Sequence, residues 1–212
     1  CLAKEGYSVE WRVVNAAQYG AAQRRRRTFI FAYRNDTIYG QKMADISADM
    51  IIKDGGFMAK AFPIQDMGRI TETVIGGDIV DVSDNFAFAF EAAGYMCKGR
   101  IYTAKVIERE EEPITLGKIL QKNNVDDKFY ITNEKMPKWT YLKGAKKIPR
   151  KSADGHEYMF SEGPIAFPDP WDRPGRTMLT SESTLNRSTH VVSDPGTGRL
   201  RLLTPVEAER LQ

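Results

Sequence analysis

The chain has 212 residues, which is enough for one large domain or two small ones with a buried core. Its net charge of +3 excludes a general polycation, so a nucleic-acid surface would need local clustering of charge. The few cysteines and histidines exclude a disulfide framework and give no metal-ligand spacing. No apolar run reaches the roughly 20 residues of a membrane span, and no signal peptide is visible. A reducing, cytoplasmic setting fits best.

The first third of the chain predicts a hairpin followed by a helix. A strand is expected over 8–14, a loop over 15–22, and a second strand over 27–34. The second strand is apolar on both faces, as in a parallel or mixed sheet covered by helices, so the hairpin is expected at the edge of such a sheet. A helix is expected over 41–53 and ends at a glycine pair.

The middle of the chain is rich in β-branched and aromatic residues, which predicts several short strands and turns over 73–107. Phe86, Phe88 and Phe90 alternate with alanine at the period of a strand, and we interpret them as core residues rather than a stacking platform. The acidic run at 108–112 predicts a solvated linker, and a short helix is expected over 115–123.

The last residues predict the start of a helix. Thr204 suits the N-cap, Pro205 the first helical position, and Glu207 completes a capping box, so we assign Thr204 and Glu207 to capping rather than chemistry. The chain begins without methionine and stops at Gln212 inside this expected helix. We interpret it as a fragment of a longer protein.

Four consecutive arginines, Arg24 to Arg27, run directly into the second apolar strand. In an extended strand, side chains alternate between faces, so Gln23, Arg25 and Arg27 would share one face and Arg24 and Arg26 the other. A guanidinium beside a rigid strand can donate paired hydrogen bonds to a phosphate or a base edge. The alternative is a basic edge that only contacts solvent.

Two segments resemble motifs of the DNA cytosine-5 methyltransferases. The first family motif reads Asn-Ala-x-x-Tyr-Gly-x-x-Gln-x-Arg-x-Arg, and the second reads Arg-x-Leu-Thr-Pro-x-Glu-x-x-Arg-Leu-Gln. The family places a variable target-recognition domain between them, and Thr177 with Met178 resembles its entry pair, although methionine departs from the usual second residue. The matching residues are Asn15, Ala16, Tyr19, Gly20, Gln23, Arg25 and Arg27 for the first motif, and Arg201, Leu203, Thr204, Pro205, Glu207, Arg210, Leu211 and Gln212 for the second.

The resemblance implies an α/β (α+β) fold in two parts. Residues 1–36 would be the C-terminal edge of a catalytic, Rossmann-like domain, and residues 37–59 would be a connecting helix and loop. Residues 60–195 would form a smaller, mostly β target-recognition domain. Residues 196–212 would return toward the catalytic domain.

The resemblance also implies a reaction. In the family, a cytosine is flipped out of the duplex, a Pro-Cys cysteine attacks C6, and S-adenosylmethionine donates a methyl group to C5. By resemblance, Arg25 and Arg27 would hold the flipped base, and Gln23 would support them. The chain lacks the family's Phe-x-Gly-x-Gly cofactor loop and Glu-Asn-Val motif, Cys97 follows methionine, and Cys1 precedes the first motif. We therefore expect this piece to be inactive alone and to bind no S-adenosylmethionine, and we interpret Cys97 as a core cysteine.

Two groups of residues are candidates for contact with DNA. One is a basic, aromatic stretch whose lysines and arginines could neutralise phosphates, and the other is a polar loop after Thr177 that could read base edges. The alternative for the first group is a solubilising loop around a buried tryptophan. The candidates are Lys143, Lys146, Lys147, Arg150 and Lys151, then Thr177, Thr180, Ser181, Glu182, Ser183, Asn186 and Arg187.

The expected partner is double-stranded DNA, with no membrane. The parent enzyme would be a monomeric, cytoplasmic protein of a bacterial or phage restriction-modification system, encoded beside a restriction endonuclease that it does not bind stably. Two alternatives stay open. One is a related tRNA cytosine-5 methyltransferase, against which the long segment between the motifs argues; the other is a DNA-binding module without an enzyme.

Overall fold

The structure is a computed structural model that describes residues 2–76 and 78–212, so the prediction about Cys1 lies outside the described residues. The chain divides into two compact units. Unit 1 comprises Cys1–Tyr19 and Arg25–Glu112, and unit 2 comprises Gly20–Arg24 and Pro113–Gln212. The compact units do not correspond to the catalytic and target-recognition domains expected from the family, whose boundaries at 36, 60 and 195 stay predictions. None of the described helices is long and apolar enough to cross a membrane.

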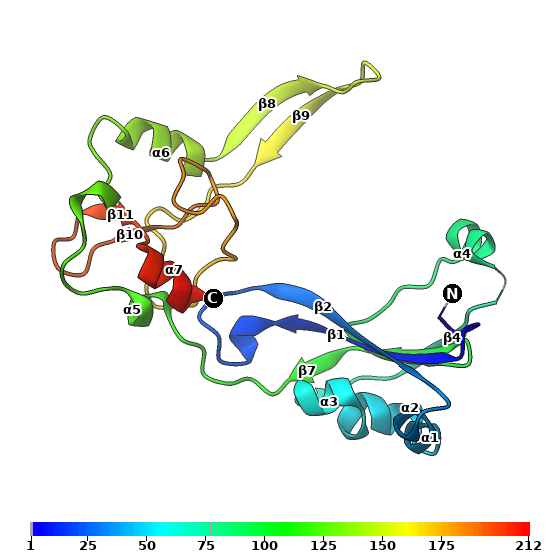
Figure 1. Ribbon diagram of the computed structural model, residues 1–212. Coiled ribbons are helices and arrows are strands. Elements are labelled where there is room, and N and C mark those ends of the chain that lie inside the picture. The colour runs from blue at the N-terminus through cyan, green and yellow to red at the C-terminus, as the bar shows by residue number, and fades with distance from the viewer. Residues whose placement is uncertain (1, 77) are drawn as a thin grey trace. The chain divides into compact units, whose positions relative to one another are not determined.

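Unit 1 is built on a five-stranded sheet in the order β2-β1-β5-β6-β4 (Figure 1). The predicted hairpin is confirmed, with β2 at the edge of the sheet, but every strand pair is antiparallel rather than mixed. A separate pair, β3 with β7, is also antiparallel. The strands are β1 (Tyr7–Asn15), β2 (Arg26–Arg34), β3 (Ile64–Met67), β4 (Thr71–Val74), β5 (Ala93–Cys97), β6 (Arg100–Ala104) and β7 (Val106–Glu108).

Strand β1 explains why the sheet has one covered face. Its residues alternate strictly between buried and half-buried positions, as the two-residue period of a strand requires. Ser8, Glu10, Arg12 and Val14 are the buried set. Strand β2 is largely exposed, so the expectation that it is covered on both faces is wrong.

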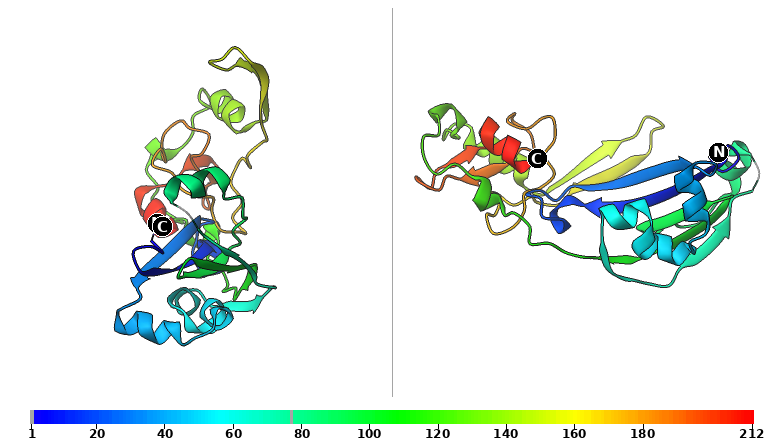
Figure 2. Two further views of the ribbon diagram at one scale, coloured as in Figure 1. Left: turned by 90° about the vertical axis from the view of Figure 1, so that its right-hand side faces the viewer. Right: turned by 60° about the horizontal axis from the view of Figure 1, so that its bottom comes forward.

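A run of helices lies against one face of this sheet (Figure 2). The expected single helix over 41–53 is interrupted, because Ser47 adopts an extended conformation and starts a new helix. The core between helices and sheet includes Tyr33, Met43, Ile51 and Tyr95, with Cys97 packed against it. The helical segments are η1 (Ala16–Gln18), α1 (Ile38–Ala44), α2 (Ala48–Met50), the π-helical turn η2 (Ile51–Gly55), α3 (Phe57–Ala61) and α4 (Ile79–Asn85).

The phenylalanine repeat does not form a strand. Asp78 caps helix α4 by accepting from the N–H groups of Val80 and Asp81, and the three phenylalanines follow that helix in an irregular segment. Their rings contact one another, with the centroids of Phe86 and Phe90 5.7 Å apart, but none of the three is fully buried. The strand predicted from the two-residue period is therefore wrong. A capped helix ends directly before Phe86, and the phenylalanines follow it without forming a strand.

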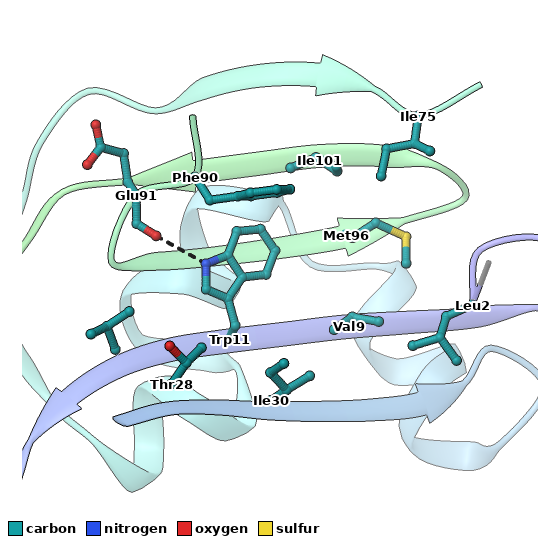
Figure 3. Close-up of a pocket in the computed structure, with 11 residues that line it drawn as sticks. Leu2, Val9, Trp11, Thr28, Ile30, Ile75, Phe90, Glu91, Met96 and Ile101 are labelled. Carbon is teal, nitrogen blue, oxygen red and sulfur yellow. Dashed lines mark hydrogen bonds between the residues drawn. The ribbon is translucent and has the colours of Figure 1, made fainter. Parts of the chain in front are cut away.

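The other face of the sheet holds an apolar cavity of about 530 Å³ (Figure 3). Trp11 lies across Gly94 on the neighbouring strand, and its Nε1 donates to the carbonyl of Glu91 at 3.1 Å. A Cβ at Gly94 would lie 2.0 Å from the Trp11 ring, so this packing requires glycine. The cavity is lined by Leu2, Val9, Trp11, Val13, Thr28, Ile30, Ile75, Phe90, Glu91, Met96 and Ile101.

Unit 2 is held by a small core in which Leu116, Val192, Leu203 and Leu211 are fully buried. The short helix expected over 115–123 is observed only at its start, as α5. The elements are α5 (Leu116–Ile119), η3 (Asp127–Phe129), α6 (Met136–Lys143), β8 (Lys146–Lys151), β9 (Glu157–Glu162), β10 (Val191–Ser193), β11 (Leu200–Leu202) and α7 (Pro205–Leu211).

The predicted capping box at the start of α7 is confirmed, with Thr204 as N-cap and Glu207 closing it. Glu207 has a second contact, because both of its carboxylate oxygens accept from Arg201, at 2.7 and 2.8 Å. Arg201 also donates to Asp194 at 2.8 Å. All three side chains are buried, so this ion cluster joins β11, α7 and the β10–β11 turn.

Candidate nucleic-acid interface

Gln23 and Thr177, which are far apart in sequence, meet inside unit 2. The N–H of Arg24 donates to the carbonyl of Gly175 at 2.8 Å, and the Gly175 N–H donates to Ala22 at 2.8 Å. The Gln23 side chain is buried and its Oε1 accepts from the N–H of Met178 at 3.3 Å. Thr177 Oγ1 donates to the Arg24 carbonyl at 2.6 Å. We call these residues, 22–24 and 175–178, the motif junction.

The motif junction changes the interpretation of the arginine run. The strand expected over 27–34 is confirmed, since β2 begins at Arg26, where it pairs with Asn15. Residues 23–25 lie before it, so the assignment of Gln23, Arg25 and Arg27 to one face of a single strand does not hold. The reason is that residues 22–24 bond to 175 instead of to β1. Arg25 is half-buried, whereas Arg27 is exposed and its Nη1 donates to the carbonyl of Arg26 at 2.7 Å.

An ion pair between the half-buried Arg176 and the buried Asp169 supports the junction from within unit 2. Arg176 donates to both carboxylate oxygens of Asp169, at 2.7 and 3.1 Å, and Asp169 also accepts from the N–H of Val191. A Cβ at Gly175 would lie 2.8 Å from Leu211, so the chain passes close to helix α7 here. This pair was missed in the sequence, because a lone aspartate in a proline-rich turn gives no local signal of burial.

The polar loop after the junction, residues 180–187, contains side chains that bond within unit 2 as well as exposed ones. Glu182 accepts from both the backbone N–H and Nδ1 of His190, at 2.8 and 3.0 Å, and its side chain is only 8% exposed. Glu182 is therefore turned away from a surface where DNA could lie. Thr180, Ser183 and Asn186 are exposed, while Thr177 and Ser181 are intermediate.

Strands β8 and β9 form a two-stranded ribbon that extends from the end of α6 (Figure 1). Lys147, Arg150 and Lys151 are exposed along it. Lys146 is mostly covered, because its Nζ lies 3.5 Å from Glu162 and 4.8 Å from the centre of the Tyr141 ring. Most of the basic candidates therefore lie on one element.

Two predicted DNA contacts lie instead at the base of this ribbon. Lys143 is buried, and its Nζ donates to the carbonyls of Arg187 and Thr189. Burial, together with the nearby Arg176 guanidinium, lowers the pKa of Lys143 to about 8. Arg187 is 18% exposed and donates to the carbonyls of Leu142, Gly144 and Gly163. Neither cation is aimed at solvent.

The comparisons with known proteins show the family of the chain. Residues 1–212 match the family described as C-5 cytosine-specific DNA methylase. The chain belongs to this family. It is also 51% identical over 209 residues, 97% of its length, to the Type II methyltransferase M.Sau3AI of Staphylococcus aureus. The methylase chain spans 50% of that relative. No solved structure matches it significantly.

The methylase fold class expected from the sequence is confirmed as mixed α/β, with a central antiparallel sheet and small additional sheets. Residues of both family motifs have defined structural roles in unit 2. Gln23 of the first motif lies in the motif junction, and the second motif supplies Arg201 and the capping box of α7.

Proposed function

We propose that this chain is the DNA-recognition part of a longer DNA cytosine-5 methyltransferase of a bacterial or phage restriction-modification system. In this function, the whole enzyme flips a target cytosine and methylates its C5, whereas the chain alone lacks catalysis. The family match over residues 1–212 and the Type II methyltransferase name of the S. aureus relative support this interpretation. The family motifs that supply the nucleophile and bind the cofactor are missing from this sequence, which supports the proposal that the chain alone lacks catalysis.

The observation that carries the proposal is the motif junction. It joins Gln23 of the arginine motif to Met178 through a hydrogen bond, and Arg24 to Thr177 through another. A contact between the base-holding motif and the entry of the recognition segment would couple binding of the target site to placement of the arginines. We infer that Gln23 acts here as a positioning residue.

Arg25 and Arg27 would hold the flipped base. Flipping costs a few kcal/mol of unstacking, which contacts with the protein must offset. A guanidinium stays protonated throughout the working pH range and can donate to cytosine O2 without a change of charge. Arg27 is exposed; its Nη1 donates to the Arg26 carbonyl, and its Nε and Nη2 groups would donate to a base.

S-adenosylmethionine would supply the methyl group in the whole enzyme. The apolar cavity of unit 1 does not fit this cofactor, because it offers only Thr28 and Glu91 as polar side chains apart from the Trp11 N–H already bonded to Glu91. The amino acid and ribose of the cofactor need several hydrogen-bond partners. We therefore propose that residues of the whole enzyme outside this chain bind the cofactor.

Double-stranded DNA is the proposed partner. The exposed candidates for contact with it are Lys147, Arg150, Lys151, Thr180, Ser183 and Asn186, with Thr177 and Ser181 at the margin and Lys146 mostly covered. The whole enzyme would act as a cytoplasmic monomer, without a stable complex with its restriction endonuclease. Lys143, Glu182 and Arg187 are left out of the contact set because their charged groups are held internally.

The experiment compares Arg27→Ala with Arg26→Ala in the full-length enzyme. Methylation of duplex DNA and of tRNA is followed with labelled S-adenosylmethionine, and DNA binding is measured separately. We expect Arg27→Ala to lower kcat by about 10²- to 10³-fold, as for loss of one positioned donor, with DNA affinity nearly unchanged. Arg26→Ala should be nearly silent. Near-normal turnover in Arg27→Ala would contradict the role of Arg27, and methylation of tRNA alone would contradict the DNA substrate.

A further inference from the structure

The β8–β9 ribbon has two faces of different character. Residues directly opposite in an antiparallel pair share a face, and neighbours along a strand alternate. The register pairs Lys147 with Ser161 and Pro149 with Met159. One face, which we call the outer face, therefore carries Lys147, Pro149, Lys151, Glu157, Met159 and Ser161, and the inner face carries Lys146, Ile148, Arg150, Tyr158, Phe160 and Glu162.

The inner face is satisfied within the chain. Arg150 stacks over the Phe160 ring, with its guanidinium carbon 3.8 Å from the ring centre. Lys146 pairs with Glu162, and Ile148 and Phe160 are half-buried. The charged groups of this face therefore have contacts within the chain, and the exposed Arg150 is the one cation of this face that stays a candidate for contact with DNA.

The outer face is entirely exposed. Within the described part of the chain, neither Lys147 nor Lys151 has an ion-pair partner, and Met159 is 59% exposed. The face is not simply basic, since Glu157 lies opposite Lys151. It combines amine donors, a carboxylate acceptor, a hydroxyl and an apolar thioether.

This set of groups matches the edges that base pairs present in the major groove. Guanine offers acceptors to lysine, cytosine offers an amino donor to glutamate, and thymine offers a methyl group to an apolar side chain. A purely electrostatic surface would not carry Glu157. The composition of the outer face therefore favours base reading over general attraction to phosphates.

The dimensions of the ribbon favour the same groove. The major groove is about 12 Å wide and admits a two-stranded ribbon, whereas the minor groove, about 6 Å wide, does not. Strands of this length span about 20 Å, roughly half a dozen base-pair steps. The ribbon can therefore place several side chains against one short site.

Arg187 fixes the base of the ribbon. Its guanidinium donates to Leu142 at 2.6 Å and to Gly144 at 3.0 Å, before β8, and to the Gly163 carbonyl, after β9. Lys143 donates to the Arg187 carbonyl at 2.9 Å and so holds Arg187 itself. Hydrogen bonds from Arg187, at the end of the polar loop, therefore hold both the start of β8 and the end of β9.

We propose that the outer face of the β8–β9 ribbon reads base edges in the major groove of duplex DNA, and that Arg187 is a positioning residue that sets the ribbon against the polar loop. This inference rests on the proposed function, because it assumes that the chain recognises a DNA site. It adds a reading element, Glu157, Met159 and Ser161, beyond the basic residues alone.

The test uses a duplex library with randomised sequence. The 212-residue chain selects bound duplexes, and the full-length enzyme methylates the same library, read by bisulfite sequencing. The variants Glu157→Gln and Met159→Ala change only exposed side chains of the outer face. The control is Tyr158→Phe, an exposed residue of the inner face that is not among the candidates for contact with DNA. We expect each outer-face variant to change the preference between two sites about 5- to 150-fold, as for loss of one base contact. Tyr158→Phe should leave the preference unchanged.

The role of Arg187 is separated from direct contact by the salt dependence of binding. A phosphate contact contributes about 0.9 to the slope of log K against log salt, so its loss would flatten the slope. We expect Arg187→Ala to relax site preference with the slope unchanged, and Arg187→Lys to restore part of the preference. Thermal unfolding of both variants shows whether either has lost its fold. A flatter slope of log K against log salt in Arg187→Ala would overturn the positioning role.

The outcomes distinguish this inference from the proposed function. If the full-length enzyme does not methylate cytosine C5, the proposed function is wrong, while the selection by the chain still reports on the ribbon. If the enzyme methylates DNA but the outer-face variants keep the wild-type preference, the ribbon inference is wrong. Absence of duplex binding by the chain would also overturn it.

Discussion

Arg201 shows how a single residue can hold one unit together. Its guanidinium is fully buried and bonds to Asp194 and Glu207, so removal would leave two carboxylates buried without a partner. We expect Arg201→Ala to lower the free energy of unfolding by about 3–5 kcal/mol. Arg199→Ala is the control, because the pair of Arg199 with Asp127 is exposed and worth little. Urea unfolding followed by circular dichroism measures both, and equal midpoints for the two variants would contradict the role of Arg201.

Glu10 gives a residue-scale prediction about pH. Burial raises the pKa of the Glu10 carboxyl above its usual 4.5, although the N–H of Met58 donates to it at 2.9 Å. A raised folded-state pKa contributes stability that is present below 4.5 and lost as pH rises through the folded-state value. We expect Glu10→Gln to remove this loss of stability with rising pH, because glutamine does not ionise. Urea midpoints at pH 4.5 and at pH 7 for both proteins check it, and an identical pH dependence would argue against a buried charge.

At the scale of elements, the sequence predicted those structures whose cause is local. The β1–β2 hairpin follows from two apolar runs close together, and the α7 capping box from Thr204 and Glu207. The phenylalanine repeat was misread, because period two also fits an irregular segment in which rings cluster after a helix. Ser47 interrupts the helix expected over 41–53 for a similar reason, since serine both tolerates a helix and starts one.

The packing of β1 against β5 depends on Gly94. A Cβ there would lie 2.0 Å from the Trp11 ring, so Gly94→Ala must displace the ring or the strand. We expect a loss of about 1–3 kcal/mol in unfolding free energy, the usual cost of overpacking. Gly68→Ala is the control, because its Cβ would meet the nearest atom only at 3.6 Å. A Trp11→Leu change in the same chain should reduce the cost of Gly94→Ala, whereas strictly additive losses would show that the two residues do not clash.

For the whole molecule, the candidate site was predicted in part. The motif residues Gln23 and Thr177 were singled out separately, and their hydrogen-bonded junction could not be foreseen because it depends on long-range folding. The same holds for Lys143, Glu182 and Arg187, whose residue types suggest DNA contact but whose charges are bonded internally. Residue type alone does not distinguish a cation that meets phosphate from one that meets buried carbonyls.

The uncovered face of the unit 1 sheet leads to a prediction for the chain in solution. Ile30 is 67% exposed on the edge strand β2 and lines the apolar cavity. An exposed apolar face beside an unpaired strand edge promotes association between copies. We expect the isolated chain to self-associate with rising concentration in sedimentation velocity, and Ile30→Lys to shift it toward monomer.

The matched control for this prediction is Ile38→Lys. Ile38 is more exposed, at 89%, but lies at the start of α1 and does not line the cavity. If hydrophobicity in general drove association, both substitutions would weaken it, and Ile38→Lys would do so at least as strongly. If the sheet face drives it, only Ile30→Lys should, because that change places a charge within the apolar surface and on the exposed edge, where lysine opposes strand pairing between chains.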